Sequence, residues 1–82
     1  MENQYRIKRV YVNKKLTETE QKVWRLKLKS MVELTGIVSI CLDDEVMFIE
    51  YNPILIQGNS IIKELKRINY PMRGSAQVSL YH

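Results

Sequence analysis

The side chains that could do chemistry are few and lie far apart in the sequence. Cys41 is the only cysteine and His82 the only histidine. The two share no motif, so a nucleophile would have no base to activate it. Asp43, Asp44 and Glu45 form the densest group of carboxylates, but a calcium loop needs alternating ligands and a glycine. We therefore expect no enzymatic activity, no cofactor and no small-molecule substrate.

The size of the chain and its cysteine content limit the class of protein. A length of 82 residues gives one domain, 1–82, with one core and a thin margin of stability. A single cysteine excludes an internal disulfide and fits a reducing compartment. Residues 1–6 are polar and show no apolar core of a signal peptide, and no apolar run approaches the roughly 18 residues of a membrane helix. These features predict a cytoplasmic protein without membrane insertion.

Positive charge is concentrated in the first third of the chain. Residues 1–30 carry nine Lys or Arg against three Glu, although the whole chain has a net charge of only +4. Such an excess can attract nucleic acid, anionic lipid or an acidic partner. The interpretation that we favour is a solvated helix face, because the excess is modest.

Hydrophobic periodicity predicts four strands and two helices. Thr17 and Glu20 have the spacing of a capping box, and Gly36 is placed to end the helix that they begin. Asn69 is placed to end the second helix, since asparagine tolerates left-handed φ best after glycine. The predicted strands are Tyr5–Val12, Ile37–Leu42, Val46–Tyr51 and Ser75–Tyr81, and the predicted helices are Thr17–Leu34 and Asn59–Ile68.

The order of these elements, βαββαβ, predicts a ferredoxin-like α+β sandwich. Two right-handed crossovers and one hairpin give a four-stranded antiparallel sheet in the order 4-1-3-2, with two helices on one face. The first and third strands are expected in the centre of this sheet.

Residues 36–70 carry a series of positions that together form a recognisable pattern. They are Gly36-Ile37 after the first helix, Ile40 and Leu42 in a strand, Tyr51-Asn52-Pro53, the apolar positions Ile61, Ile62 and Leu65, and Asn69-Tyr70, and from Pro53 onward the register runs without a gap. This series resembles the heavy-metal-associated domain of copper chaperones and metal-pumping ATPases. The resemblance implies the ferredoxin-like fold and a metal-trafficking ancestry.

The family holds Cu(I) or Zn(II) in a Met-Thr-Cys-x-x-Cys motif, and this chain has no such motif. Counted forward from the first strand, Leu16 and Thr17 fall on Met-Thr, and Glu18 and Gln21 fall on the two cysteines. Counted back from Gly36, the cysteine positions are instead Glu20 and Val23. Neither register supplies a thiol, and hard carboxylate or amide ligands cannot replace thiolates toward a soft ion. We expect a degenerate loop without a metal.

One constellation is expected on the face of the sheet that the helices leave uncovered. Alternation places Arg9 and Tyr11, Phe48 and Cys41 there, with Tyr81 on the last strand. Uncovered sheet faces are mostly polar, so a mixed face with two aromatic rings indicates a contact surface.

These observations predict a small non-enzymatic binding domain that acts through protein–protein contacts or self-association on this face. Single-stranded nucleic-acid binding on the same face is the first alternative, because RNA-recognition domains of this topology stack bases on sheet aromatics. A residual metal-binding or transport role is the second alternative. A protein partner is favoured over nucleic acid because Glu50 lies beside Phe48 and would repel phosphate. In addition, Lys22, Arg25 and Lys29 are predicted on the first helix, behind the sheet.

Overall fold

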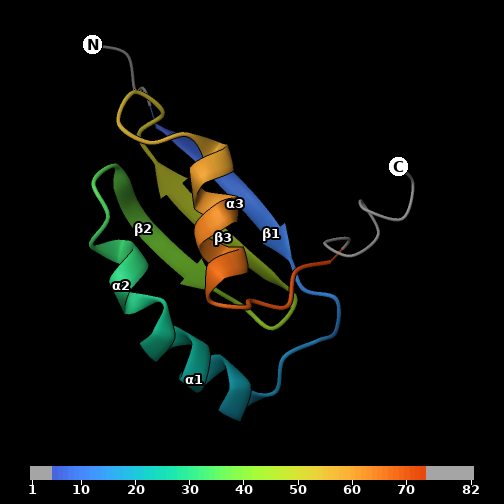
Figure 1. Ribbon diagram of the computed structural model, residues 1–82. Helices are drawn as coiled ribbons and strands as arrows, with labels where there is room; N and C mark the ends of the chain where they lie inside the picture. The colour runs from blue at the N-terminus through green and yellow to red at the C-terminus, as the bar shows by residue number, and fades with distance from the viewer. Residues whose placement is uncertain (1–4, 74–82) are drawn as a thin grey trace.

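The chain forms a small α+β domain, which a computed structural model describes over residues 5–73 (Figure 1). Within these residues three antiparallel strands form one sheet in the order β1-β3-β2, and the helices lie on one side of it. The elements in chain order are β1 (Arg6–Tyr11), α1 (Glu18–Lys27), α2 (Lys29–Val32), β2 (Ile37–Leu42), β3 (Val46–Tyr51) and α3 (Gly58–Arg67).

Strands β2 and β3 form the predicted hairpin. The Asp43 N–H donates to the Val46 carbonyl over 2.9 Å and closes the turn. On the other side, β3 pairs with β1 in a register that sets Val10 against Met47 and Arg9 against Phe48. Because successive side chains alternate between the two faces, this register separates a face directed at the helices from an open one.

The core lies between the sheet and the helices and, in the described residues, is formed by hydrophobic side chains. Met47 and Ile49 of the central strand are completely buried, as are Ile61 and Leu65 of α3. Val10 and Val12 complete the sheet side of this core, as the alternation predicts. Burial of apolar area of this kind is the main stabilising contribution in a domain of this size.

The capping box at the start of α1 is confirmed, but the long first helix is wrong. The Thr17 hydroxyl accepts the Glu20 N–H over 3.1 Å, and the Glu20 carboxylate accepts the Thr17 N–H over 2.9 Å. The helix then breaks at Leu28 into α1 and the short α2, which ends at Val32, before Gly36. A tighter turn follows the break, since Met31 N–H bonds to the Leu28 carbonyl three residues back. Leu28 and Met31, at the break and in α2, are both buried in the core.

Gly36 adopts a φ of +101° at the entry to β2, a conformation that L side chains rarely adopt. A Cβ at this position would lie 2.7 Å from Ile56 Cγ2 and 3.0 Å from Leu55 Cβ. Glycine is therefore required here by close approach of the loop after β3 as well as by backbone conformation.

The end of α3 forms a Schellman motif, as Asn69 predicts. Asn69 has a φ of +64°. Its N–H donates to the Lys66 carbonyl and the Tyr70 N–H donates to the Leu65 carbonyl, over 3.0 and 2.9 Å. Leu65 and Tyr70 are both buried, which supplies the hydrophobic contact of this motif.

The predicted four-stranded sheet with order 4-1-3-2 is wrong for the structure, which has three strands with β3 in the centre and three helices in place of two. The expected last strand, Ser75–Tyr81, lies outside the described residues. Among the described residues after α3, Met72 forms an isolated bridge with Val12 at the end of β1. Pro71, which has no N–H to donate, precedes that bridge. As a result, β1 is an edge strand among residues 5–73.

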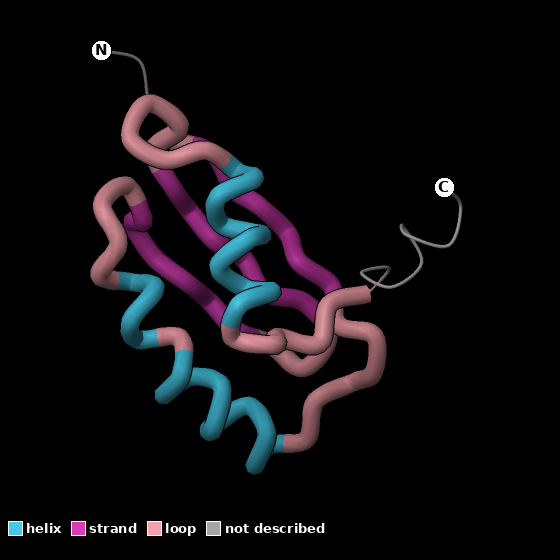
Figure 2. The backbone as a smooth tube through the Cα atoms, in the orientation of Figure 1, coloured by secondary structure: helices cyan, strands magenta, loops and turns pink. Residues whose placement is uncertain are grey.

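Figure 2 shows α3 lying across the sheet, whereas α1 and α2 run along its β2 side. Among residues 5–73, no helix is both long enough and apolar enough to cross a lipid bilayer.

Candidate interaction surface

The side of the sheet opposite the helices carries a mixed set of apolar and charged side chains. We call it the open face. Across the three strands, Arg9, Phe48 and Cys41 form one row, and Ile7, Glu50 and Ser39 form the next. In the described residues it consists of Ile7, Arg9, Tyr11, Ser39, Cys41, Val46, Phe48 and Glu50.

Apolar area on the open face is exposed. Ile7 is 57% exposed and Tyr11 45%, while Phe48 on the central strand is half-buried. Tyr11 pairs with Val46, and Phe48 pairs with Arg9, so the two aromatic rings occupy diagonal positions on neighbouring strands. The prediction that both aromatics lie together on this face is consistent with this register.

An arginine side chain lies beside each of the two aromatic rings, Tyr11 and Phe48. The Arg9 guanidinium carbon lies 6.0 Å from the centre of the Phe48 ring. The Arg73 guanidinium carbon lies 5.2 Å from the centre of the Tyr11 ring. Such cation–π pairs keep the guanidinium near the ring while its N–H donors stay available to a ligand.

Arg73 is the residue of this surface that the sequence did not predict. It comes to β1 because the Arg73 N–H donates to the Tyr11 carbonyl over 2.6 Å and the Asn13 N–H donates to the Pro71 carbonyl. No local pattern marks this contact, since it joins segments about 60 residues apart in sequence. Arg9 is therefore not the only cation close to the aromatic rings of the open face.

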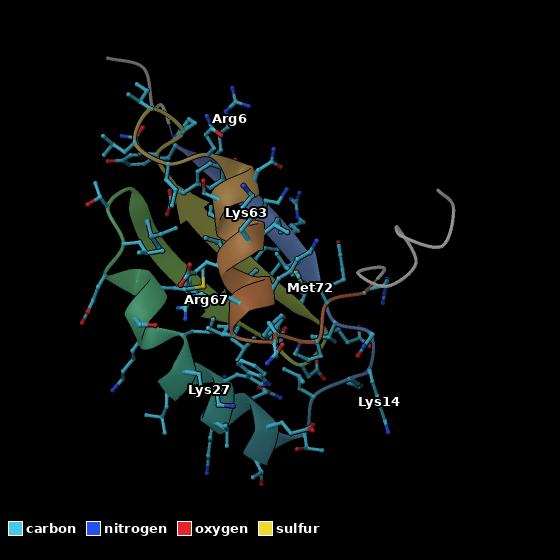
Figure 3. The ribbon with its side chains drawn as sticks, viewed as in Figure 1. Arg6, Lys14, Lys27, Lys63, Arg67 and Met72 are labelled. Atoms are coloured by element: carbon cyan, nitrogen blue, oxygen red, sulfur yellow. The ribbon has the colours of Figure 1, made fainter. Side chains whose placement is uncertain are left out.

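One acidic side chain belongs to the open face. Glu50 accepts a hydrogen bond from the Ser39 hydroxyl over 3.4 Å and sits one row from Phe48. Many of the other cations lie on the helical layer, and Figure 3 shows Lys27 on α1 and Lys63 and Arg67 on α3. This distribution gives the open face a mixed, weakly positive character instead of a strongly basic one.

Cys41 is an exposed free cysteine on the open face, as predicted. Tyr81, the other residue expected on this surface, lies outside the described residues. The arrangement therefore brings together Arg9, Tyr11, Phe48 and Cys41 from the predicted set.

Of the four loop positions that were aligned with the metal-binding motif, three have a structural role and Glu18 does not. Leu16 is buried in the core, and Thr17 caps α1. The Gln21 amide donates to the Leu16 carbonyl over 3.4 Å, whereas Glu18 is exposed. Among residues 5–73, no three His, Cys, Asp or Glu side chains are grouped so that they could hold a metal ion. Cys41 lies on the opposite side of the sheet from this loop, so it does not supplement it.

The groups with shifted pKa values lie on α3 and directly after it, away from the open face. Burial raises the pKa of the Tyr70 phenol to about 12. On α3, a hydrogen bond from Arg67 lowers the pKa of the Glu64 carboxyl, and the same bond raises the pKa of Arg67. These two groups are exposed neighbours on one helix face, an ordinary surface pair.

No protein-family model, curated protein or solved structure matches this chain.

Proposed function

We propose that this protein is a small non-enzymatic binding domain of the cytoplasm, and that its open face binds another protein. The observation that carries the proposal is the exposure of Ile7, Tyr11 and the half-buried Phe48 on a sheet face that no described element covers. Contiguous exposed apolar area of this kind is typical of interaction sites. The resemblance of residues 36–70 supports a heavy-metal-associated ancestry, from which the thiol site has been lost.

The side chains around the aromatic rings define the partner's chemistry. Arg9 and Arg73 present two guanidinium groups held against rings. A guanidinium in this setting binds a carboxylate through two parallel hydrogen bonds. The proposed partner therefore offers apolar side chains flanked by Asp or Glu. Arginine and aromatic anchors of this type contribute most of the binding free energy at protein interfaces.

Single-stranded nucleic acid is a second candidate, favoured by one observation, the position of Arg73 beside Tyr11. Two aromatics with two cations are the components of a base-stacking platform. Against it, both rings already carry an arginine, which a stacking base would have to displace. Glu50 would also lie close to the phosphate backbone, where its charge is unfavourable.

The proposal is tested by replacing Ile7 with a photoreactive amino acid, because this side chain is exposed within the open face. Irradiation in cells should crosslink the domain to a protein, and the same crosslink should disappear in the Tyr11→Ala/Phe48→Ala variant. The matched control places the photoreactive residue at Lys63 on α3. A crosslinking pattern that is the same from both positions would contradict the proposal.

A titration with single-stranded oligonucleotides at low and high salt separates the two candidates. The protein proposal expects no micromolar binding. Binding that falls steeply with salt and is lost in the Tyr11→Ala/Phe48→Ala variant would establish the nucleic-acid function instead, since phosphate contacts release counterions. The circular dichroism spectrum of the variant shows whether its fold is intact.

A further inference from the structure

Strand β2 has a free edge in the part of the chain that the structure describes. The sheet order β1-β3-β2 leaves one side of β2 without a neighbouring strand. The hydrogen bond from the Asp43 N–H to the Val46 carbonyl determines which residues of β2 form backbone hydrogen bonds with β3, because hydrogen-bonded and non-hydrogen-bonded pairs alternate along the strand. Cys41 and Ser39 therefore direct their backbone groups toward β3, while Ile40 and Leu42 direct theirs outward. This is confirmed at Leu42, whose carbonyl accepts a hydrogen bond from Arg25 over 3.3 Å.

The edge lacks most of the devices that normally prevent strand pairing. Residues 37–42 contain no charged residue and no proline, and charges or prolines are the usual protection of an edge strand. A bulge at Val38 interrupts the register between Ile37 and Ser39. The regular free edge therefore runs from Ser39 to Leu42, the length of a short peptide contact.

A groove accompanies this edge on the helical side. It has a volume of about 190 Å³ and is lined by Arg25, Leu28, Lys29 and Val32 of the α1–α2 region and by Ile40 and Leu42 of β2. The groove exists because α1 and α2 run beside β2 and do not cover the sheet (Figure 1). Its floor is apolar, and its charged lining residues are Arg25 and Lys29.

We propose that the β2 edge and this groove bind an extended acidic peptide segment of another protein. The peptide adds a strand beside β2, with its backbone paired to Ile40 and to the Leu42 N–H, since the Leu42 carbonyl already accepts a hydrogen bond from Arg25. Apolar side chains on one face of the peptide enter the groove over Leu28 and Val32, and carboxylates on that same face meet Arg25 and Lys29. Strand addition of this kind takes affinity from main-chain hydrogen bonds and specificity from alternate side chains. This surface is separate from the open face.

A second copy of the chain is a poorer occupant than an acidic peptide. Antiparallel pairing of two β2 edges about a two-fold axis keeps both helical layers on the same side of the joined sheet. The α1–α2 regions would then face each other with Arg25 and Lys29 from both copies at the seam, where like charges are unfavourable. Asp44 of the hairpin does not offset this charge, because it pairs with Lys15 of its own copy at 3.5 Å.

The test is an NMR titration of the isotope-labelled protein with the capped heptapeptide Glu-Thr-Val-Thr-Val-Thr-Glu, whose Glu and Val side chains share one face of an extended strand. We expect the Ile40 and Leu42 amides to shift and to exchange more slowly with solvent. A peptide with Lys in place of Glu, and the Glu peptide with N-methylated backbone, should each bind at least about tenfold more weakly. The Arg25→Gln/Lys29→Gln variant should lose about tenfold for the Glu peptide.

Two variants locate the binding. Lys63→Gln/Lys66→Gln removes the same number of charges from α3 and should bind the Glu peptide as the wild type does. Tyr11→Ala/Phe48→Ala should also retain binding, which separates this proposal from that for the open face. The proposal is overturned if the Ile40 and Leu42 amides do not respond at millimolar peptide, or if the Glu and Lys peptides bind equally. Sedimentation showing a dimer with these amides protected without peptide would identify a second copy as the occupant.

Discussion

The two ten-residue helices, α1 and α3, are held to the domain in different ways. Ile61 and Leu65 of α3 are completely buried. In α1 no residue is fully buried, and Leu26 is 65% exposed. The chain anchors α1 at its two ends, through the capping box of Thr17 and Glu20 and through the buried Leu28 that follows it. An apolar stripe thus predicts that a helix forms but does not predict how deeply it packs.

One side-chain contact links α1 to the segment after α3. The Trp24 ring meets Tyr70 edge-to-face, with 5.1 Å between centroids, and Lys27 covers the Trp24 ring at 4.7 Å. Trp24 is half-buried, whereas Tyr70 is 4% exposed. Because Trp24 is the only tryptophan, its fluorescence reports the attachment of α1.

The largest effect is expected from truncating the buried stripe of α3. Leu65→Ala removes a completely buried side chain and should lower the free energy of unfolding by about 2–5 kcal/mol. The matched variant in α1, Leu26→Ala, should change it by less than about 0.5 kcal/mol, because this side chain is mostly exposed. Urea denaturation followed by circular dichroism measures both. Similar losses in the two variants would mean that α1 is packed as firmly as α3.

A smaller effect, confined to alkaline pH, is expected at Tyr70. Its hydroxyl is buried without a hydrogen-bond partner among the described residues, and burial raises its pKa to about 12 from an ordinary value near 10. The folded state therefore favours the neutral phenol. This contribution is fully present below about pH 10 and is lost as the pH rises toward 12, where the loss reaches about 2 kcal/mol.

The pH dependence of urea denaturation checks this prediction. Tyr70→Phe should remove the loss between pH 10 and 12 and should be close to neutral at pH 7, since the hydroxyl has no partner to lose. Tyr11→Phe is the matched control, because that ring is 45% exposed and the variant keeps Tyr70. An alkaline loss of the same size in Tyr70→Phe would assign it to other groups.

The parts of the fold that depend on neighbouring residues could be predicted from the sequence. The Thr17–Glu20 cap, the hairpin turn and the left-handed Asn69 each arise from bonds or steric limits within a few residues. The faces of the sheet were predictable as well, because alternation fixes them once a strand is identified.

The remaining features depend on contacts between distant segments. The helical periodicity of residues 17–34 does not mark the break at Leu28, because Leu28 and Met31 would share a face of an unbroken helix as well. The bridge from Val12 to Met72 and the resulting position of Arg73 join the first strand to the end of the described chain. The topology predicted from the βαββαβ pattern therefore placed β1 in the centre of the sheet, whereas among residues 5–73 it lies at an edge.

The smallest effect is expected at the helix N-caps, where the chain offers a matched pair. Thr17→Ala removes a hydroxyl that accepts the Glu20 N–H and should lower stability by about 1 kcal/mol. Gln57→Ala replaces the N-cap of α3, whose side chain makes no capping bond, and should change stability by only a few tenths of a kcal/mol.

Because burial fixes α3 while the cap fixes α1, the Thr17 variant should loosen α1 before the domain unfolds. Amide exchange should then quicken in α1 but not in α3, and Trp24 fluorescence should change at lower urea than circular dichroism does. Equal acceleration in both helices would show that the domain opens only as one cooperative unit, and that α1 is not the weaker attachment.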